Sequence, residues 1–469
     1  MLEQTLDLTA VPAPVTDVWD ALGHETVLVG GAVRDWLGGV IQHDWDLATP
    51  LTPDGMRAAL APLKGVGIIP TGERFGTLTI RYRHETVEVT TFRRDGRYTR
   101  EGRAPERVAY TTSLEEDLKR RDFTMNAMAV CLDGTLVDPF HGRQDLEKGV
   151  IRAVGDPAQR LTEDPLRMWR AVRFLTYSTT ANGGPFVLET ALRAAIHRNR
   201  AQLVRVSLER QRHELWRILE SPLRASALWD ASRTGILALF WPEWVATMGF
   251  DQENPYHHFT LDRHLLEAAA RAPSPPLALA GLLHDIAKPV CLVRGPENVE
   301  GTDQLIGHFP GHDDVGAQMV RDMLHRTRWS NRLVEATAML VAHHMFPWED
   351  AGDHAVRGLI RRVGGPVARD LLALHRMDVQ ATQCDRDVPD WAGQAARLER
   401  LIDEVPQAPR QPILTVTGHQ VMRWAGVETG PRVGEILRAA EDWVLEDPTR
   451  NTPAQLEAFI RTQGLVDPP

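Results

Sequence analysis

The spacing of apolar residues changes once along this chain, near Glu163. Before that point, four short runs are typical of β-strands, with short helical stretches between them: ETVLVG, GTLTIRYR, TVEVTTF and MNAMAV. After it, segments such as DPLRMWRAVRFL, LALAGLLHDIAK and NRLVEATAMLVAHH repeat apolar residues at helical spacing. The pattern predicts an α/β head with a mixed sheet, followed by a remainder that is all helix.

The chain has 469 residues, more than one ordinary core accommodates, so we expect several domains. With 43% hydrophobic and 25% charged residues, its composition is that of a soluble globular protein. The N-terminal MLEQTLDLTAVPAP carries acids and prolines where a secretory signal has a basic start and an apolar centre. Cys131, Cys291 and Cys384 are odd in number and far apart, which argues against a disulfide framework. These features favour a cytoplasmic protein.

A pair of glycines opens the stretch GGAVRDWLGGVIQHDWDLAT, residues 30–49. Gly30 and Gly31 follow an apolar strand-like run and precede a short helical one. Such a turn lets a phosphate approach the backbone, with Arg34 and the start of the helix facing it. A Gly-Gly pair is a weak signal by itself.

An Asp-x-Asp pair closes the same stretch. If VIQHDWDLAT is a strand, Asp44 and Asp46 project from one face while Trp45 and Leu47 enter the core from the other. Two carboxylates on one face repel each other unless cations lie between them. The pair therefore predicts a site for two Mg²⁺ ions, with a polar edge strand as the alternative.

The formal net charge of −10 argues against nucleic-acid binding through the overall field of the molecule, so any such binding is local. One helical segment carries a basic stripe that several phosphates would fit. It contains Glu209 and Glu214 among seven arginines: Arg193, Arg198, Arg200, Arg205, Arg210, Arg212 and Arg217. A solvated helix face is an equally good interpretation of this segment taken alone.

The order Gly-Gly, a helix with Arg-Asp, and Asp-x-Asp on the next strand resembles the nucleotidyltransferase superfamily that includes DNA polymerase β. The resemblance implies that Asp44 and Asp46 hold the metal ions that bridge a triphosphate and activate an attacking hydroxyl. It also implies a third carboxylate on a neighbouring strand, for which Glu88 in TVEVTTF is the candidate. A simple cross-strand partner is the competing interpretation of Glu88.

Further motifs narrow the family: DLKRRDFTMNAMAV, DPFHGRQDLEKGVIRAVGDP and RLTEDPLRMWRAVRF. Together with LTVTGHQVMRWAGVETGPRVGEIL near the C-terminus, they resemble the class II CCA-adding tRNA nucleotidyltransferases and their relatives, the bacterial poly(A) polymerases. The resemblance runs from about residue 24 to 217 and resumes in the tail. We expect a catalytic head at 1–150, a helical neck with the base-selecting motif at 151–220, a helical HD-containing body at 221–405 and a helical tRNA-binding tail at 406–469.

The RRD motif offers groups for a nucleotide. Asp122 and Asn126 are four residues apart and share a face if the stretch is helical, so they offer acceptors for a ribose 2′-hydroxyl. Arg120 and Arg121 offer cations for the triphosphate. The resemblance implies the same use. Surface ion pairs between these arginines and the acidic residues 115–117 are the alternative.

In EDPLRMWRA, the resemblance assigns base selection to Asp164 and Arg167 and places Arg170 near the phosphates or the base. One carboxylate and one guanidinium match the Watson–Crick edge of cytosine or adenine, whereas uracil and guanine leave a buried partner unsatisfied. CTP and ATP are then chosen without a nucleic-acid template. Asp164 before Pro165 also suits a helix N-cap, so both roles hold only if nucleotide binding frees the side chain.

Nine of the eighteen histidines lie between residues 257 and 344. The segments LLHDIAKP and ALHRMDVQ resemble the HD phosphohydrolase domain, which implies a divalent transition metal that activates water at phosphate esters. The implied ligands are His264, His284, Asp285 and Asp378. His308, His312 and His343 are candidates to extend this site or to contact phosphate. Hydrogen-bonded core histidines are the alternative interpretation.

These motifs together predict an enzyme that adds C, C and A to the 3′ end of the tRNA acceptor arm from CTP and ATP. Residues 93–118 form a basic loop of full length, which in the family favours complete CCA addition. The HD domain implies possible phosphodiesterase or phosphatase side activities. The alternatives are a partial adder of CC or A, a poly(A) polymerase, a metal-dependent phosphohydrolase and a non-catalytic tRNA-binding protein. The poly(A) polymerase is the less favoured alternative, because those relatives are expected to carry a basic C-terminal extension, whereas the tail of this chain is acidic.

Overall fold

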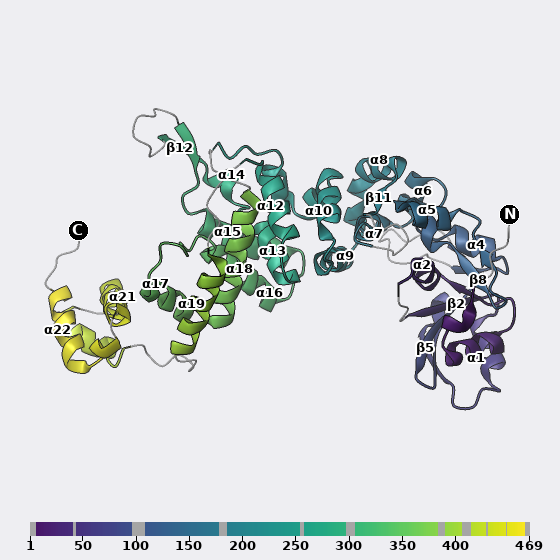
Figure 1. The fold of residues 1–469 in the computed structure, drawn as a ribbon, viewed down its shortest axis with the longest axis horizontal. Coiled ribbons are helices and arrows are strands. Elements are labelled where there is room, and N and C mark those ends of the chain that lie inside the picture. Colours follow the sequence, from purple (N-terminus) through teal and green to yellow (C-terminus); the bar gives the residue numbers. More distant parts are fainter. Residues whose placement is uncertain are drawn as a thin grey trace. The chain divides into compact units, whose positions relative to one another are not determined.

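The computed structural model describes residues 6–40, 44–95, 108–177, 185–253, 258–296, 305–382, 390–405, 414–427, 430–446 and 448–464. The chain divides into two compact units (Figure 1). The first contains residues 1–250, 260–279 and 322–331, and the second contains residues 251–259, 280–321 and 332–469. The domain boundaries expected at residues 150, 220 and 405 stay predictions. Within the described residues, no helix combines the length and the apolar character needed to cross a membrane.

The first unit begins with the α/β head that the sequence predicts. Its seven-stranded mixed sheet has the order β3-β4-β5-β2-β1-β8-β9, and β2 and β5 are its parallel neighbours. The strands are β1 (Val27–Val29), β2 (Trp45–Thr49), β3 (Gly67–Gly72), β4 (Thr77–Tyr82), β5 (Glu85–Thr91), β8 (Ala129–Cys131) and β9 (Leu136–Val137). The head helices are α1 (Ala13–Leu22), α2 (Gly31–Leu37), α3 (Pro53–Leu60), α4 (Leu114–Lys119) and α5 (Gly142–Lys148), and a separate pair of strands consists of β6 (Arg93–Asp95) and β7 (Val108–Tyr110).

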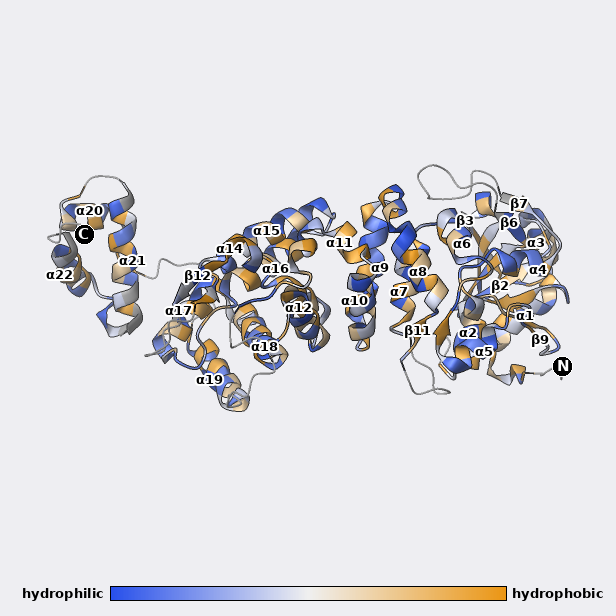
Figure 2. Cartoon of the chain, turned by 90° about the horizontal axis from the view of Figure 1, so that it is seen from above, coloured by the Kyte–Doolittle hydropathy of each residue, from blue (hydrophilic) through white to orange (hydrophobic). Residues whose placement is uncertain are grey.

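Buried side chains of the sheet and of α1 form the core of the head; in β4 and β5 they alternate with more exposed ones. Trp19 of α1, Leu28 of β1 and Leu47 of β2 are fully buried or nearly so. The indole Nε1 of Trp19 donates a hydrogen bond to the carbonyl of Thr26 at 2.8 Å, which satisfies the polar atom of this buried ring. Figure 2 shows hydrophobic segments in the interior of the head and hydrophilic ones on the surrounding helices.

One predicted strand is shorter than expected. In MNAMAV only the end is extended, because β8 begins at Ala129, while Thr124–Asn126 form a 3₁₀ turn. Asp122 and Asn126 therefore do not share an α-helical face. The tight turn nevertheless brings them together, since the Asn126 side-chain amide donates to Asp122 Oδ1 at 2.9 Å.

After the head, the described residues are mainly helical, and two pairs of short strands among them differ from the all-helix expectation. The parallel pair β10 (Val150–Ile151) and β11 (Val187–Leu188) and the antiparallel pair β12 (Val293–Pro296) and β13 (Leu305–His308) lie after the head sheet. These runs are two to four residues long, too short for their alternation to stand out in the sequence. After the head, the first unit continues with the helices α6 (Pro157–Glu163), α7 (Arg167–Phe174), α8 (Thr190–Asn199), α9 (Leu208–Glu220), α10 (Arg224–Arg233), α11 (Ile236–Phe240) and α12 (Leu261–Ala270).

A buried polar contact fixes α7 against α9. Trp169 of α7 is fully buried, and its Nε1 donates to Gln211 Oε1 at 3.1 Å. The Gln211 amide in turn donates to the carbonyls of Leu203 and Val206, each at 3.0 Å. Because every polar atom in this chain of contacts is used, α7 has one well-defined position in the neck.

Helix α13 (Pro275–Leu283) contains the residues at which the first unit passes into the second. The second unit contains α14 (Lys288–Cys291), α16 (Asn331–His343), α17 (Asp353–Val363), α18 (Gly365–Thr382) and α19 (Trp391–Glu404), and α15 (His312–Arg326) also crosses the division. The tail helices are α20 (Gly418–Ala425), α21 (Pro431–Glu446) and α22 (Pro453–Gly464). They enclose a cluster of their own that includes Val421, Ile436, Leu456 and Ile460.

Candidate active site

The glycine pair forms the turn between β1 and α2. Gly30 precedes the helix with φ 70° and ψ −132°, a conformation that only glycine adopts without strain. A Cβ atom at this position would lie 2.9 Å from Nη1 of Arg121 and 3.8 Å from Oδ2 of Asp46. The missing side chain therefore leaves the space in which the Arg121 guanidinium lies close to the Asp46 carboxylate.

The Asp-x-Asp pair lies where the alternation of β2 predicts. Trp45 and Leu47 are buried, whereas Asp44 is exposed and Asp46 is half-buried. In the parallel pairing of β2 with β5, the partner of Asp46 is Glu88. The sheet thus brings the third predicted carboxylate next to the second.

This carboxylate group has the electrostatics of a cation site. Burial, followed by the negative charge of Glu88, raises the pKa of Asp46 to about 6, and Arg121 opposes that rise. Oxygen donors that repel one another match the preference of Mg²⁺ for carboxylates, so these residues fit the expected ion. Among the described residues, the groups of three or more potential ligands within 4.8 Å of one another both lie elsewhere, so the three head carboxylates are spaced more widely than that.

The two arginines of the RRD motif form ion pairs with Asp117, a buried acid. The sequence had suggested Asp117 only as one of three acids in surface ion pairs with these arginines. Asp117 of α4 is fully buried and lies 2.8 Å from Arg120 Nη2 and 3.1 Å from Arg121 Nη2. Burial by itself would raise the pKa of Asp117, but the two arginines outweigh it and lower the pKa. Asp117 therefore holds both guanidinium groups beside the carboxylate site.

Asp122 connects the head to the neck. Its carboxylate accepts from Asn126 through Oδ1 and lies 2.6 Å from Arg170 Nη2 of α7 through Oδ2. Burial would raise the pKa of Asp122, but the charge of Arg170, the Asn126 amide and the charge of Arg167 together hold it well below its usual range. Asn126 uses its carbonyl oxygen to accept from Arg34 Nη1 at 2.8 Å.

The two predicted base-selecting residues are engaged within the protein. Arg167 is buried, and its guanidinium donates to Glu163 Oε2 at 2.8 Å, to the carbonyl of Arg160 at 2.9 Å and to the carbonyl of Arg120 at 3.0 Å. Asp164 Oδ1 accepts from the backbone N–H of Leu166 at 3.1 Å.

The N-cap lies two residues after the expected one. Helix α7 begins at Arg167 with Leu166 as its N-cap, so Asp164 caps the turn before the helix, and Pro165 is not the first helical residue. The Asp164 carboxylate also lies 3.4 Å from Arg210 of α9. Both side chains have to exchange these partners before they can contact a base.

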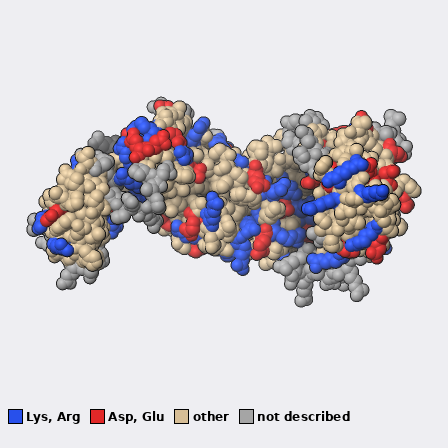
Figure 3. Space-filling view, turned by 90° about the horizontal axis from the view of Figure 1, so that it is seen from below, with Lys and Arg blue, Asp and Glu red and all other residues tan. Residues whose placement is uncertain are grey.

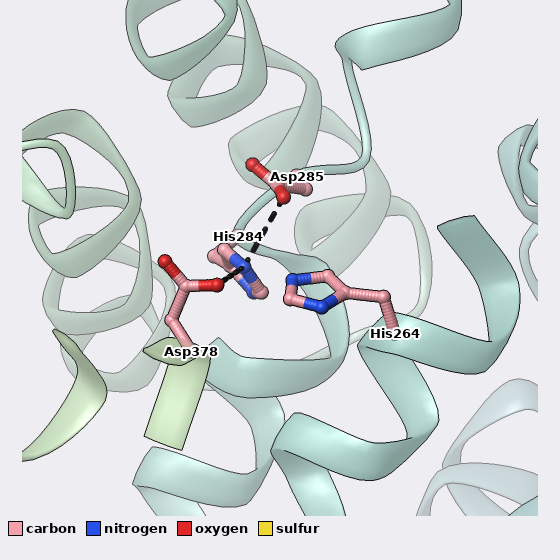
Figure 4. A group of neighbouring side chains, drawn as sticks. All are labelled: His264, His284, Asp285 and Asp378. Atoms are coloured by element: carbon pink, nitrogen blue, oxygen red, sulfur yellow. Dashed lines mark ion pairs between the residues drawn. The ribbon is translucent and has the colours of Figure 1, made fainter. Parts of the chain in front are cut away.

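The four predicted HD ligands lie together. Ligand atoms of His264, His284, Asp285 and Asp378 are all within 4.8 Å of one another. In Figure 4, His264 and Asp378 extend from their helices toward His284. His284 Nε2 lies 3.3 Å from Asp285 Oδ2 and 3.5 Å from Asp378 Oδ1, while its Nδ1 lies 2.9 Å from the carbonyl of Gly281.

This donor set fits a divalent transition metal. A carbonyl partner at Nδ1 fixes the ring so that Nε2 faces the carboxylates, as in metal-ligating histidines. Burial would lower the pKa of His284, but Asp285 and Asp378 raise it to about 10. A divalent ion at this place would supply the positive charge that the two carboxylates attract.

A second group shares Asp285 with the first. Ligand atoms of Asp285, His312 and His344, all three buried, lie within 4.8 Å of one another. The two histidine Nε2 atoms are 3.1 and 3.3 Å from Asp285 Oδ1, and their Nδ1 atoms lie 2.7 Å from backbone carbonyls. Lys288 Nζ lies 2.6 Å from the other oxygen, Oδ2.

Of the three histidines expected to extend the site, one does so. His312 belongs to the second group, whereas His308 lies on β13 near the carbonyl of Pro296, and His343 is in neither group. Sequence reasoning missed His344. The adjacent pair His343-His344 carries the signal: α16 ends at His343, and His344, directly after it, is the one that joins the cluster.

The sequence matches three family models. They are the poly A polymerase head domain over residues 26–152, the probable RNA and SrmB-binding site of polymerase A over residues 185–248, and the HD domain over residues 263–382. With the carboxylates and glycines described above, they define a nucleotidyltransferase that carries an HD domain.

Curated relatives narrow the class. The A-adding tRNA nucleotidyltransferase of Deinococcus radiodurans is 35% identical over 92% of this chain and 94% of its own length. The CCA-adding enzyme of Geobacillus thermodenitrificans is 42% identical over a matched region that makes up 46% of this chain and 50% of that enzyme. The solved structure of the Bacillus stearothermophilus CCA-adding enzyme in complex with CTP matches with a TM-score of 0.62 and 26% identity, covering 96% of each chain. The chain belongs to the class II tRNA nucleotidyltransferase and poly(A) polymerase family.

Proposed function

We propose that this enzyme adds C, C and A to the 3′ end of tRNA from CTP and ATP without a nucleic-acid template. The observation that carries the proposal is the pairing of Asp46 with Glu88 across β2 and β5, next to the Gly30 turn and Arg121. That arrangement concentrates carboxylates and one cation where a triphosphate would lie. Full-length similarity to a tRNA nucleotidyltransferase supports tRNA as the acceptor.

In the reaction, the 3′-hydroxyl of tRNA attacks the α-phosphate of the nucleotide and pyrophosphate leaves. Asp44 and Asp46 would hold Mg²⁺, which supplies charge neutralisation of the triphosphate and a lower pKa for the attacking hydroxyl. Glu88 adds negative charge beside Asp46 and so strengthens the attraction for cations. Arg120 and Arg121, held by Asp117, bind the triphosphate oxygens as charged donors.

Nucleotide selection involves the neck. Asp122 and Asn126 receive the ribose, and Asp164 and Arg167 pair with the base after they leave their present partners. Arg170 lies against Asp122, so it is then close to the ribose and to the base. A wrong base leaves a buried donor or acceptor unsatisfied, which costs roughly 1–3 kcal/mol per group, or about ten- to a hundredfold in selectivity.

Addition of the terminal A alone is the second candidate. The A-adding enzyme of Deinococcus radiodurans matches along 92% of this chain, whereas the sequence of the CCA-adding enzyme of Geobacillus thermodenitrificans matches over 46% of it. The segment 93–118, expected as a loop whose length favours complete addition, contains β6, β7 and most of α4, and its residues 96–107 are among those not described.

The basic stripe on α8 and α9 is the proposed surface for the acceptor arm. Figure 3 shows Lys and Arg side chains gathered on one face of the neck, with fewer acidic side chains among them. Arg193 and Arg217 have acidic neighbours, Asp230 and Glu220, so part of the positive charge is balanced within the protein. The match of residues 185–248 to an RNA-binding model supports this location.

The HD region has a second proposed activity, hydrolysis of phosphate esters at a divalent transition metal. Two ligand groups that share Asp285 favour it, because in sites for two ions one carboxylate can serve both. His284→Ala would abolish hydrolysis of a 2′,3′-cyclic nucleotide in the presence of Ni²⁺ or Mn²⁺ and leave nucleotide addition intact. Equal hydrolysis by His284→Ala and wild type would remove this activity from the proposal.

The decisive experiment incubates the protein and Mg²⁺ with tRNAs that end at the discriminator base, at C and at CC, each with CTP, ATP or both. Products are resolved at single-nucleotide length. Addition of CCA to the shortest tRNA is expected, with loss in Asp44→Ala and no change in Asp20→Ala, which alters an exposed aspartate on α1. Extension of only the CC-ended tRNA would identify the A-adding alternative, a long A tail would identify a poly(A) polymerase, and no extension would refute the proposal.

A further inference from the structure

A series of polar contacts connects Arg170 of α7, through residues of the head, with Tyr177 after the end of α7. From Arg170 it passes to Asp122 and then to Asn126. Asn126 accepts from Arg34, and Arg34 donates to Asp35. The Tyr177 hydroxyl closes the chain by donating to the same oxygen of Asp35, Oδ1.

Arg34 is held on its edges and its faces. Nε and Nη2 lie 2.7 and 2.6 Å from Asp35 Oδ1, and Nη1 lies 2.8 Å from Asn126 Oδ1. The guanidinium carbon is 4.6 Å from the ring centroid of Tyr177 and 5.1 Å from that of Phe174. With 12% of the side chain exposed, this guanidinium has one well-defined position.

We propose that Asp35 and Tyr177 are positioning residues for nucleotide selection, acting through Arg34 on the Asn126–Asp122 pair. This inference rests on the proposed role of that pair as the ribose site. When Arg34 donates to the Asn126 carbonyl oxygen, the Asn126 amide can only turn its NH₂ toward Asp122. The orientation of the ribose site therefore depends on a tyrosine that contacts neither member of the pair.

Two observations support this role. The Tyr177 hydroxyl is a donor at physiological pH, as any tyrosine with an ordinary pKa is, and burial raises its pKa further against the opposing charge of Arg34. Arg34 and Tyr177 also line a cavity of about 360 Å³ together with Arg173, Arg217 and Glu220, so this chain of contacts borders open space.

The test compares Tyr177→Phe, which keeps the ring stacked on Arg34 and removes only the hydroxyl, with Asp35→Asn. Dissociation constants of ATP and dATP and the KM and kcat for each are measured. We expect the preference for ATP over dATP to fall about tenfold in both variants, mainly through KM, because a hydrogen bond to a charged group is lost. The double variant should lose little more than either single one, since both act through the same contact.

Tyr110→Phe is the matched control, because Tyr110 is an exposed tyrosine on β7 of the same head and is expected to keep the wild-type ratio. An unchanged ATP/dATP ratio in folded Tyr177→Phe and Asp35→Asn would overturn the inference. A loss of kcat with no change in the ratio would likewise overturn it, since it would indicate general support of the head. If wild type fails to extend tRNA, the proposed function fails, and the ATP and dATP dissociation constants still decide the role of Tyr177.

Discussion

The Gly30→Ala substitution tests whether the glycine turn positions Arg121 for catalysis. Alanine at φ 70° and ψ −132° is strained by about 1–3 kcal/mol, which lowers the stability of the head. Its Cβ would also lie 2.9 Å from Arg121 Nη1, whereas ordinary contact begins at 3.4 Å. The guanidinium therefore has to move by about 0.5 Å or more from its place beside Gly30, and displacements of this order lower kcat by about ten- to a hundredfold.

Gly23→Ala is the control that distinguishes the effect of backbone strain from the effect of displacing the Arg121 guanidinium. Gly23 ends α1 with φ 93° and ψ 165°, a similarly glycine-specific conformation, but nothing lies within 4 Å of a Cβ built there. Both variants should lose stability in thermal denaturation followed by circular dichroism. Only Gly30→Ala should lose nucleotide addition when the two are assayed below their melting transitions.

Equal kcat in folded Gly30→Ala and Gly23→Ala would refute the reasoning, because Arg121 would then tolerate displacement without effect. A loss of activity in Gly23→Ala as large as in Gly30→Ala would refute it too, since strain alone would account for the effect.

Three further predictions concern charge and metal. Because the pKa of Asp122 is lower in the folded head than its unfolded value near 3.9, its contribution to stability is present above about pH 4 and is lost as the pH falls below it; Asp122→Asn should flatten the melting temperature between about pH 5 and 3. Asp117→Asn should leave Arg120 and Arg121 without their buried counter-charge and raise the KM for ATP about tenfold or more, measured in steady-state extension assays. His344→Ala should remove about one bound Ni²⁺ per chain in equilibrium dialysis, whereas the neighbouring His343→Ala should bind as wild type does; equal stoichiometry in the two would exclude a second ion at His344.

The local sequence determined the parts of this protein that depend on neighbouring residues. The alternation of Asp44, Trp45, Asp46 and Leu47 predicted which of these four side chains are buried, because strand residues point to opposite faces in turn. It does not extend to the end of β2, where Ala48 and Thr49 are both buried. The glycine pair fixed the turn, because only glycine adopts the conformation of Gly30. Recurrent apolar spacing likewise fixed the helical character of the chain after the head.

Tertiary structure decided which of these groups meet. Glu88 lies beside Asp46 because β5 pairs in parallel with β2, and no local pattern encodes that strand order. Arg167 is engaged by the carbonyl of Arg120, 47 residues away. His344, and not His343, joins Asp285 because of the rotation of its segment against the segment that carries Asp285. Periodicity tells which face of an element is buried, but the partner across that face is set by the packing of distant segments.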